Sequence, residues 1–222
     1  MGGDGLEALS IGHKLSIDDY KTIIDILYQE HENHCKSWIV RSEYDFNFKN
    51  TNVCDIYSSH NGFNEDFYKH MSGYLKSIHS LHSKILYRIN EECNIFIIGR
   101  WKSPDSIIQK LYYKNKYDFG KFPVIKCLND LLGFRIIDDN YCENKHLIIR
   151  HLEQLKENKF KIRHVDRNLD EYKAYHVYLI GDNRYFPTEL QIWDSSDAQS
   201  NMESHILHKQ MYISWIEEYN NI

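Results

Sequence analysis

The strongest constraint on the fold is a change in the spacing of apolar residues near residue 94. Before it, residues 65–92 carry apolar side chains three or four positions apart, which predicts a long amphipathic helix. After it, residues 95–99 (IFIIG) are almost wholly apolar and end in glycine, which predicts a buried strand. A helical first part joined to a sheet-forming second part is the pattern of an α+β protein.

The rest of the chain fits the same class. Further helices are predicted over 18–32, from 103 to about 117, over 143–158 and over 197–219, with Ser16 or Asp18 as first N-cap and Ser103 as second, ahead of Pro104. Strands are predicted over 133–137, 160–165, 174–180 and 188–193, whereas the aromatic, Asn-rich stretch 34–62 has no clear period. We expect a mixed sheet of about five strands flanked by helices. Residues 1–94 would be a leader and helices packing on a core formed by 95–222, within one continuous domain.

Composition narrows the class of protein. A chain of 222 residues with 42% hydrophobic and 27% charged residues suits a globular protein rather than a disordered one. The first twelve residues lack the apolar core of a signal peptide, and no apolar run has the length of a membrane span. The net charge of −5 excludes a uniformly basic nucleic-acid binder but leaves room for a local basic face. Five scattered cysteines without a CxxC pair argue against a zinc site or disulfide framework, so we expect a cytoplasmic protein.

Three short segments concentrate groups that suit catalysis. The first places Arg100 and Lys102 at a strand end and Ser106 and Lys110 one helical turn apart, where helix N–H groups and cations together favour an anion. A solvated basic helix start remains the alternative. In the second, Asp130 precedes a buried strand that carries Arg135. Asp130 is either a Mg²⁺ ligand or a turn residue, and a buried arginine requires a partner or a place at the sheet end.

The third segment is the strand containing Glu189 and Gln191. Because side chains alternate along a strand, these two point to one face while Leu190 and Ile192 point to the core. A carboxylate beside an amide on an open sheet face is a candidate site, although an ordinary solvent-facing surface would have the same pattern.

In their order and spacing, these segments resemble the synthetase domain of the RelA/SpoT family. Its pattern R-x-K-x-x-x-S-x-x-x-K is matched by Arg100, Lys102, Ser106 and Lys110, and D-x-x-G-x-R-I-I by Asp130, Gly133, Arg135, Ile136 and Ile137. Its Y-x-x-x-H and E-x-Q-I patterns are matched by Tyr172 with His176 and by Glu189, Gln191 and Ile192, and a helical histidine–lysine pair by His205 and Lys209. The resemblance covers roughly residues 95–210 and implies a nucleotidyltransferase-like fold.

The resemblance also implies a reaction and its residues. A pyrophosphate group would move from ATP to a ribose hydroxyl, with AMP as the other product. Arg100 and Arg135 would sandwich adenine, and the phosphates would be held by Lys102, Ser106 and Lys110. Asp130 and Glu189 would bind Mg²⁺, with Glu189 also helping to deprotonate the hydroxyl and Gln191 supporting it. On the acceptor side, Tyr172 would stack on the base with His176 beside the transferred group, near His205 and Lys209. Apart from these matches, we also expect Arg167 to contact the acceptor.

Departures from the family pattern bear on the acceptor. Synthetases that act on guanosine nucleotides carry K-D-Y-I-x-x-P-K-x-N-G-Y, whereas residues 163–172 here lack the Pro-Lys pair, with Asn168 at the lysine position and Glu171 at the glycine position. The Q-I-R-T run is altered at Trp193 and Asp194. We therefore expect a toxic small synthetase that modifies the tRNA 3′ CCA end and has an antitoxin partner. The alternatives are a (p)ppGpp or (p)ppApp synthetase using free nucleotides such as GDP or GTP, and an inactive RNA- or protein-binding module. Retention of Asp130 and Glu189 argues against the last.

Basic residues near the acceptor segment could contact the tRNA backbone. They fall in two runs, Lys159, Lys161, Arg163 and Arg167 in one, and Lys114, Lys116 and Lys121 in the other. Acidic residues are interspersed in both, so a solvated face is the alternative interpretation.

Overall fold

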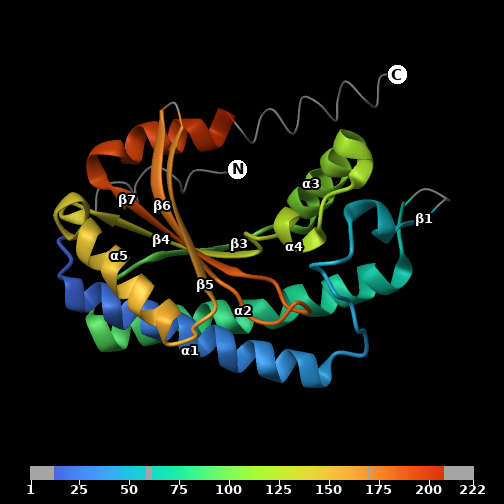
Figure 1. The fold of residues 1–222 in the computed structure, drawn as a ribbon, viewed down its shortest axis with the longest axis horizontal. Helices are drawn as coiled ribbons and strands as arrows, with labels where there is room; N and C mark the ends of the chain where they lie inside the picture. The colour runs from blue at the N-terminus through green and yellow to red at the C-terminus, as the bar shows by residue number, and fades with distance from the viewer. Residues whose placement is uncertain (1–12, 59–61, 170, 208–222) are drawn as a thin grey trace.

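A mixed five-stranded sheet is the centre of the computed structural model, which describes residues 13–58, 62–169 and 171–207 (Figure 1). The strand order is β3 (Ile98–Trp101), β4 (Leu132–Asp138), β7 (Thr188–Asp194), β6 (Tyr172–Leu179) and β5 (Ile162–Leu169). β4 and β7 run parallel, and the other neighbouring pairs run antiparallel. The expected α+β class and mixed sheet are confirmed.

Three long helices cover one face of this sheet: α1 (Ile17–Arg41), α2 (Glu65–Cys93) and α5 (Tyr141–Glu157). The alternate residues Leu132, Phe134 and Ile136 of β4 belong to the main apolar core, together with residues of these helices. The intervening residues of β4 therefore point to the opposite face, because side chains alternate along a strand. A second, smaller apolar cluster contains Ile137, Trp193 and Ala198, where the helical segment 198–207 packs.

The helix starts follow local capping chemistry. The Ser16 hydroxyl accepts a hydrogen bond from the Asp19 amide at 3.2 Å, and the Asp19 carboxylate accepts one from the Ser16 amide at 2.8 Å. This capping box identifies Ser16, rather than Asp18, as the N-cap of α1. α3 (Pro104–Lys116) begins as expected, because Ser103 Oγ accepts a hydrogen bond from the Ser106 amide at 3.3 Å.

Three expectations about element bounds were wrong. α1 continues through 34–41, which has no helical period, because contacts such as the edge-on packing of Trp38 against Tyr74 hold it. The strand predicted at 95–99 lies at Ile98–Trp101 and pairs with β4. β5 continues to Leu169 rather than ending at residue 165, so the acceptor segment belongs to a β-hairpin with β6.

Short elements complete the described chain. They are η2 (Val53–Ile56), β1 (Tyr57–Ser58), β2 (Gly62–Phe63), η3 (Tyr117–Gly120), α4 (Val124–Cys127) and η4 (Ser195–Asp197). The C-terminal helix is seen over 198–207, and the rest of its predicted span, with Lys209, lies outside the described residues. Among the helices of the described part, none is long and apolar enough to cross a membrane.

Candidate active site

Sheet register places most of the predicted residues on the face opposite α1, α2 and α5, hereafter the site face. Gly133 pairs with Arg100 on one side and with Glu189 on the other, and Glu189 pairs with Tyr178. Two residues further along β4, Arg135 pairs with Gln191, which pairs with His176. Two rows of functional side chains therefore cross the sheet, because residues two apart on a strand share a face.

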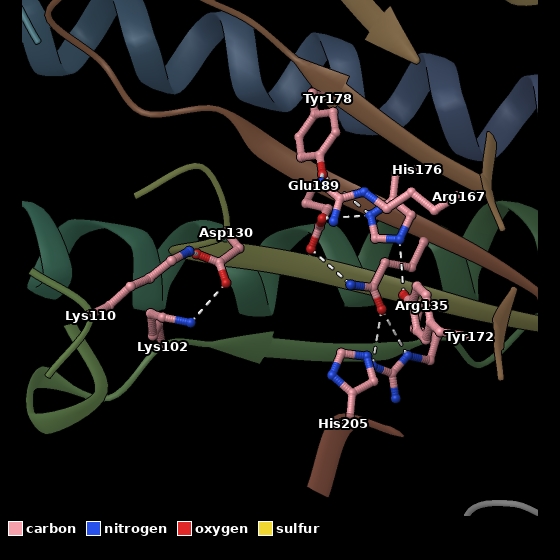
Figure 2. Close-up of polar contacts among 11 residues, drawn as sticks. Lys102, Lys110, Asp130, Arg135, Arg167, Tyr172, His176, Tyr178, Glu189 and His205 are labelled. Atoms are coloured by element: carbon pink, nitrogen blue, oxygen red, sulfur yellow. Dashed lines mark hydrogen bonds and ion pairs between the residues drawn. The ribbon is translucent and has the colours of Figure 1, made fainter. Parts of the chain in front are cut away.

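At one edge of the site, two lysines converge on one carboxylate (Figure 2). Lys102, which follows β3, lies 2.7 Å from Asp130 Oδ2, and Lys110 of α3 lies 3.1 Å from Asp130 Oδ1. Burial alone would raise the pKa of Asp130, but the two ammonium groups lower it below its ordinary value. Burial in turn lowers the pKa of Lys102 despite this partner. The two cations and the acid predicted from separate segments thus form one cluster.

Glu189 is held by hydrogen bonds on both carboxylate oxygens. His176 Nδ1 donates to Glu189 Oε1 at 2.8 Å, and the Gln191 amide donates to Glu189 Oε2 at 2.9 Å. The other ring nitrogen of His176 lies 2.9 Å from the Tyr172 hydroxyl. Burial would raise the pKa of Glu189, but the hydrogen bond from His176 leads the effects that lower it. Glu189 is therefore a fixed, ionised carboxylate.

The predicted open sheet face around Glu189 was wrong. Glu189 is only 4% exposed and Gln191 only 3%. Side chains of the neighbouring strands and of the C-terminal helix cover them, among them Arg135, which donates to Gln191 Oε1 from both Nε (3.1 Å) and Nη2 (3.0 Å). The alternative of an ordinary solvent-facing surface therefore fails for these two residues.

Arg135 is paired in the way that a buried arginine requires. Its Nη2 also donates to His205 Nε2 at 3.3 Å, and its guanidinium carbon lies 3.6 Å from the centre of the Trp193 ring. Burial, followed by the charge of Arg100, lowers the pKa of Arg135 to about 10. Burial and the same two arginines lower the pKa of His205 to about 3, so its ring is neutral and accepts. His205 also meets Tyr172 edge-on, with ring centres 5.4 Å apart.

Arg100 and Arg135 lie in neighbouring rows of the site face. Rows of same-face residues on a strand lie about 6.8 Å apart, about twice the contact distance of stacked planar groups. Within the row of Arg100 and Glu189, Gly133 contributes no side chain; a Cβ there would lie 3.7 Å from Arg100 Nε and 3.8 Å from Glu189 Oε2. Gly133 therefore leaves the Arg100 side chain room to lie over β4, in the row next to that of Arg135.

The basic residues predicted on the acceptor side separate into two groups. On β5, the guanidinium of Arg163 lies 4.7 Å from the centre of the Tyr178 ring, and Arg167 Nη2 donates to the Tyr178 hydroxyl at 3.2 Å. Tyr178 itself lies beside His176. Lys161 instead contacts the carbonyl of Gly181, and Lys114 lies over the ring of Phe122. Arg163 and Arg167 thus join the site, and Lys161 and Lys114 have other partners.

Two residues of the site were not predicted as functional: Tyr178 and Trp193. Both are buried aromatic residues in strands, the usual description of core. Their spacing was the available signal, since Trp193 lies two residues after Gln191 and Tyr178 two after His176.

Ser106 stands at the start of α3, where its hydroxyl accepts from Ser103 at 2.9 Å.

Asp130 and Glu189 are the acids that could hold a metal. They are close enough for the charge of Asp130 to raise the pKa of Glu189 as one contribution. In the described residues, no group of three His, Cys, Asp or Glu side chains is arranged to hold a metal. Mg²⁺ at nucleotide sites is bound by one or two carboxylates, with phosphate oxygens completing its shell. The pair therefore fits a metal that arrives with a nucleotide.

A comparison with known proteins identifies the family of this chain. No curated protein matches the chain. The model of the region found in RelA / SpoT proteins matches residues 99–213, which is more than half of the 222 residues and includes every site residue described above. The match supports a pyrophosphotransferase activity of the synthetase type. The chain therefore belongs to the RelA/SpoT family.

Proposed function

We propose that the protein transfers the pyrophosphate group of ATP to a ribose hydroxyl at the 3′ end of tRNA, with release of AMP. The observation that carries the proposal is the convergence of Lys102 and Lys110 on Asp130, beside the buried Glu189. Clustered cations next to metal-binding acids are what phosphoryl-type transfer requires, because its catalysis consists mainly of positioning and charge neutralisation.

On the donor side, Lys102 and Lys110 leave Asp130 and pair with the phosphates of ATP. Ser106, at the start of α3, also contacts these phosphates. Adenine lies between Arg100 and Arg135. The freed Asp130 and Glu189 are the residues that would hold Mg²⁺. When bound, the metal supplies positive charge against the phosphate oxygens.

The transfer itself is an in-line displacement at the β-phosphorus. The ribose oxygen forms a bond to this atom while the bond to the oxygen of the departing AMP breaks. The proton of the hydroxyl passes to Glu189, which Gln191 and His176 hold in place. Because Glu189 is fixed from both oxygens, little reorganisation is needed in the reaction.

On the acceptor side, the terminal base stacks on Tyr172, and Arg163 and Arg167 contact the backbone. Both arginines are exposed on the site face of β5, as a polyanionic acceptor requires. The position where free-nucleotide synthetases carry a phosphate-binding lysine is Asn168 here. This departure favours an acceptor without terminal 5′ phosphates at the site. Modification of the 3′ end would block aminoacylation, so the enzyme would inhibit translation and require a protein antitoxin.

The test is transfer of label from γ-labelled ATP. Bulk tRNA, GDP and GTP are offered separately, and label is expected on tRNA alone, at its 3′-terminal nucleotide. The matched control is tRNA whose terminal ribose has been oxidised with periodate, which removes the vicinal hydroxyls and must abolish labelling. Label on GDP or GTP would instead identify a free-nucleotide synthetase. Absence of any transfer would favour an inactive binding module.

A further inference from the structure

Trp193 lies beneath the arginine assigned to adenine. Its side chain is fully buried at 0% exposure, on the site face of β7 two residues after Gln191. The guanidinium carbon of Arg135 is 3.6 Å from the centre of the Trp193 ring, which is stacking contact. One face of the guanidinium is therefore covered by indole.

The edges of the same guanidinium are also occupied. Gln191 Oε1 accepts from Nε and Nη2 at 3.1 and 3.0 Å, and His205 Nε2 accepts from Nη2 at 3.3 Å. The His205 ring stacks on Trp193 as well, with an interplanar angle of 24°. Trp193 thus supports both the arginine and the histidine that bonds to it. These contacts leave Nη1 and the face of the guanidinium turned away from Trp193, toward the row that contains Gly133.

An arginine side chain has many rotamers, and a flat stacking surface exists only when its plane is held. Hydrogen bonds at the edges fix the direction of the guanidinium, and the indole fixes its tilt. We infer that Trp193 is a positioning residue for the nucleotide donor: it holds the plane of Arg135 so that the opposite face stacks on adenine. This inference rests on the proposed function, because it takes ATP to be the donor.

The base and the phosphates of the nucleotide would be recognised at different edges of the site. Lys102, Lys110 and Asp130 lie together at the opposite edge of the site from Arg135 (Figure 2). Loss of the indole should therefore weaken recognition of adenine and spare recognition of a bare phosphate chain. A structural role for Trp193 would affect both alike.

The experiment measures the dissociation constants of ATP and of inorganic tripolyphosphate, each with Mg²⁺, by calorimetry. Trp193→Leu is compared with Trp193→Phe, which keeps an aromatic face, and circular dichroism checks that each variant is folded. Trp38→Leu is the matched control, because it removes an indole on α1 that packs against His70 and Tyr74.

We expect Trp193→Leu to raise the dissociation constant of ATP about tenfold and to leave that of tripolyphosphate unchanged. Trp193→Phe should restore most of the affinity, and Trp38→Leu should match the unmodified protein. Equal weakening of the binding of ATP and tripolyphosphate, or no change in either dissociation constant, would overturn the inference. The proposed function would still be supported if the wild-type protein produced AMP. Failure of the wild-type protein to bind ATP would overturn both.

Discussion

Asp130 compensates the positive charges of Lys102 and Lys110. The side chains of Asp130, Lys102 and Lys110 are 16–19% exposed, so water screens these ion pairs only partly. The same ammonium groups are the ones proposed to grip the phosphates. Binding of ATP with Mg²⁺ would therefore exchange partners rather than create unpaired charges, with phosphates replacing Asp130 and the metal replacing the lysines.

Asp130→Asn should both destabilise the free protein and abolish transfer. It leaves two neighbouring cations without their carboxylate, which costs about 2–3 kcal/mol, below the range for fully buried pairs because of the partial exposure. Urea unfolding measures this cost, and AMP production measures the activity. The exposed Asp139 provides the control, since Asp139→Asn should change the free energy of unfolding by less than about 0.5 kcal/mol. An Asp130→Asn protein as stable and as active as wild type would contradict both assignments.

Among individual residues, the charged residues of the site could be predicted from the sequence, whereas the aromatic ones could not. Arg135 is conspicuous in the sequence because a charge inside an apolar strand needs a partner. Trp193 and Tyr178 look like core residues, and only the fold shows which face of the strand is buried against polar groups. The partners of Arg135, namely Gln191 and His205, lie 56 and 70 residues away in the chain, so no local pattern indicates them.

Among the elements, β5 is the one that bears most directly on the proposed tRNA acceptor. It is an edge strand that pairs only with β6 in the described sheet. Arg163, Val165, Arg167 and Leu169 alternate along its site face, and all four are exposed. A row of cations and apolar side chains beside Tyr178 suits the backbone and bases of a single-stranded RNA end.

Removal of either β5 arginine should weaken tRNA binding in a salt-dependent way. For every phosphate that the protein no longer neutralises, the slope of log affinity against log salt concentration becomes shallower by about 0.7, the value for a single strand. Binding of tRNA by Arg163→Ala and Arg167→Ala, measured at several salt concentrations, tests this. Arg150→Ala changes the net charge equally at an exposed position on α5 and should leave the slope unchanged. If all three variants behaved alike, β5 would not be the tRNA-binding element.

Element types were predictable from the sequence, whereas some bounds were not. Ser103 identified the start of α3, and Ser16 was one of two candidates for the start of α1, because capping side chains bond to amides only a few residues away. The end of α1 was missed because Trp38, Ile39 and Val40 have low helix propensity, and the packing of Trp38 and Ile39 against the core holds this turn in the helix. β3 was misplaced because Ile95 and Ile97 are buried without belonging to the strand.

In the molecule as a whole, the helical layer of α1, α2 and α5 packs on the face of the sheet opposite the site, and it contains buried histidines. His31 of α1 is fully buried and bonds to Thr188 of β7 at 2.9 Å, and His70 of α2 is 3% exposed among aromatic rings. Burial is the main cause that lowers the pKa of His31 to about 3 and that of His70 to about 4. Both stay neutral in the folded protein at pH values where the unfolded chain takes up protons.

Stability should therefore fall as the pH drops from 7 toward 4. The unfolded state binds more protons in this range, since an ordinary histidine titrates near 6.5, and each such histidine costs about 2 kcal/mol between pH 7 and pH 5. Thermal unfolding across this range measures the effect. His70→Gln should flatten the pH dependence, while His146→Gln, at an exposed position of α5, should not alter it. An unchanged pH dependence in His70→Gln would rule out this source.

The nucleotide product of ATP turnover distinguishes pyrophosphate transfer from other ATP reactions, because it reports which phosphorus is attacked. With tRNA as acceptor, pyrophosphate transfer should yield AMP in amounts equal to the pyrophosphorylated acceptor, no ADP, and no turnover in a folded Glu189→Gln variant. Release of ADP, or undiminished AMP production by Glu189→Gln, would contradict it.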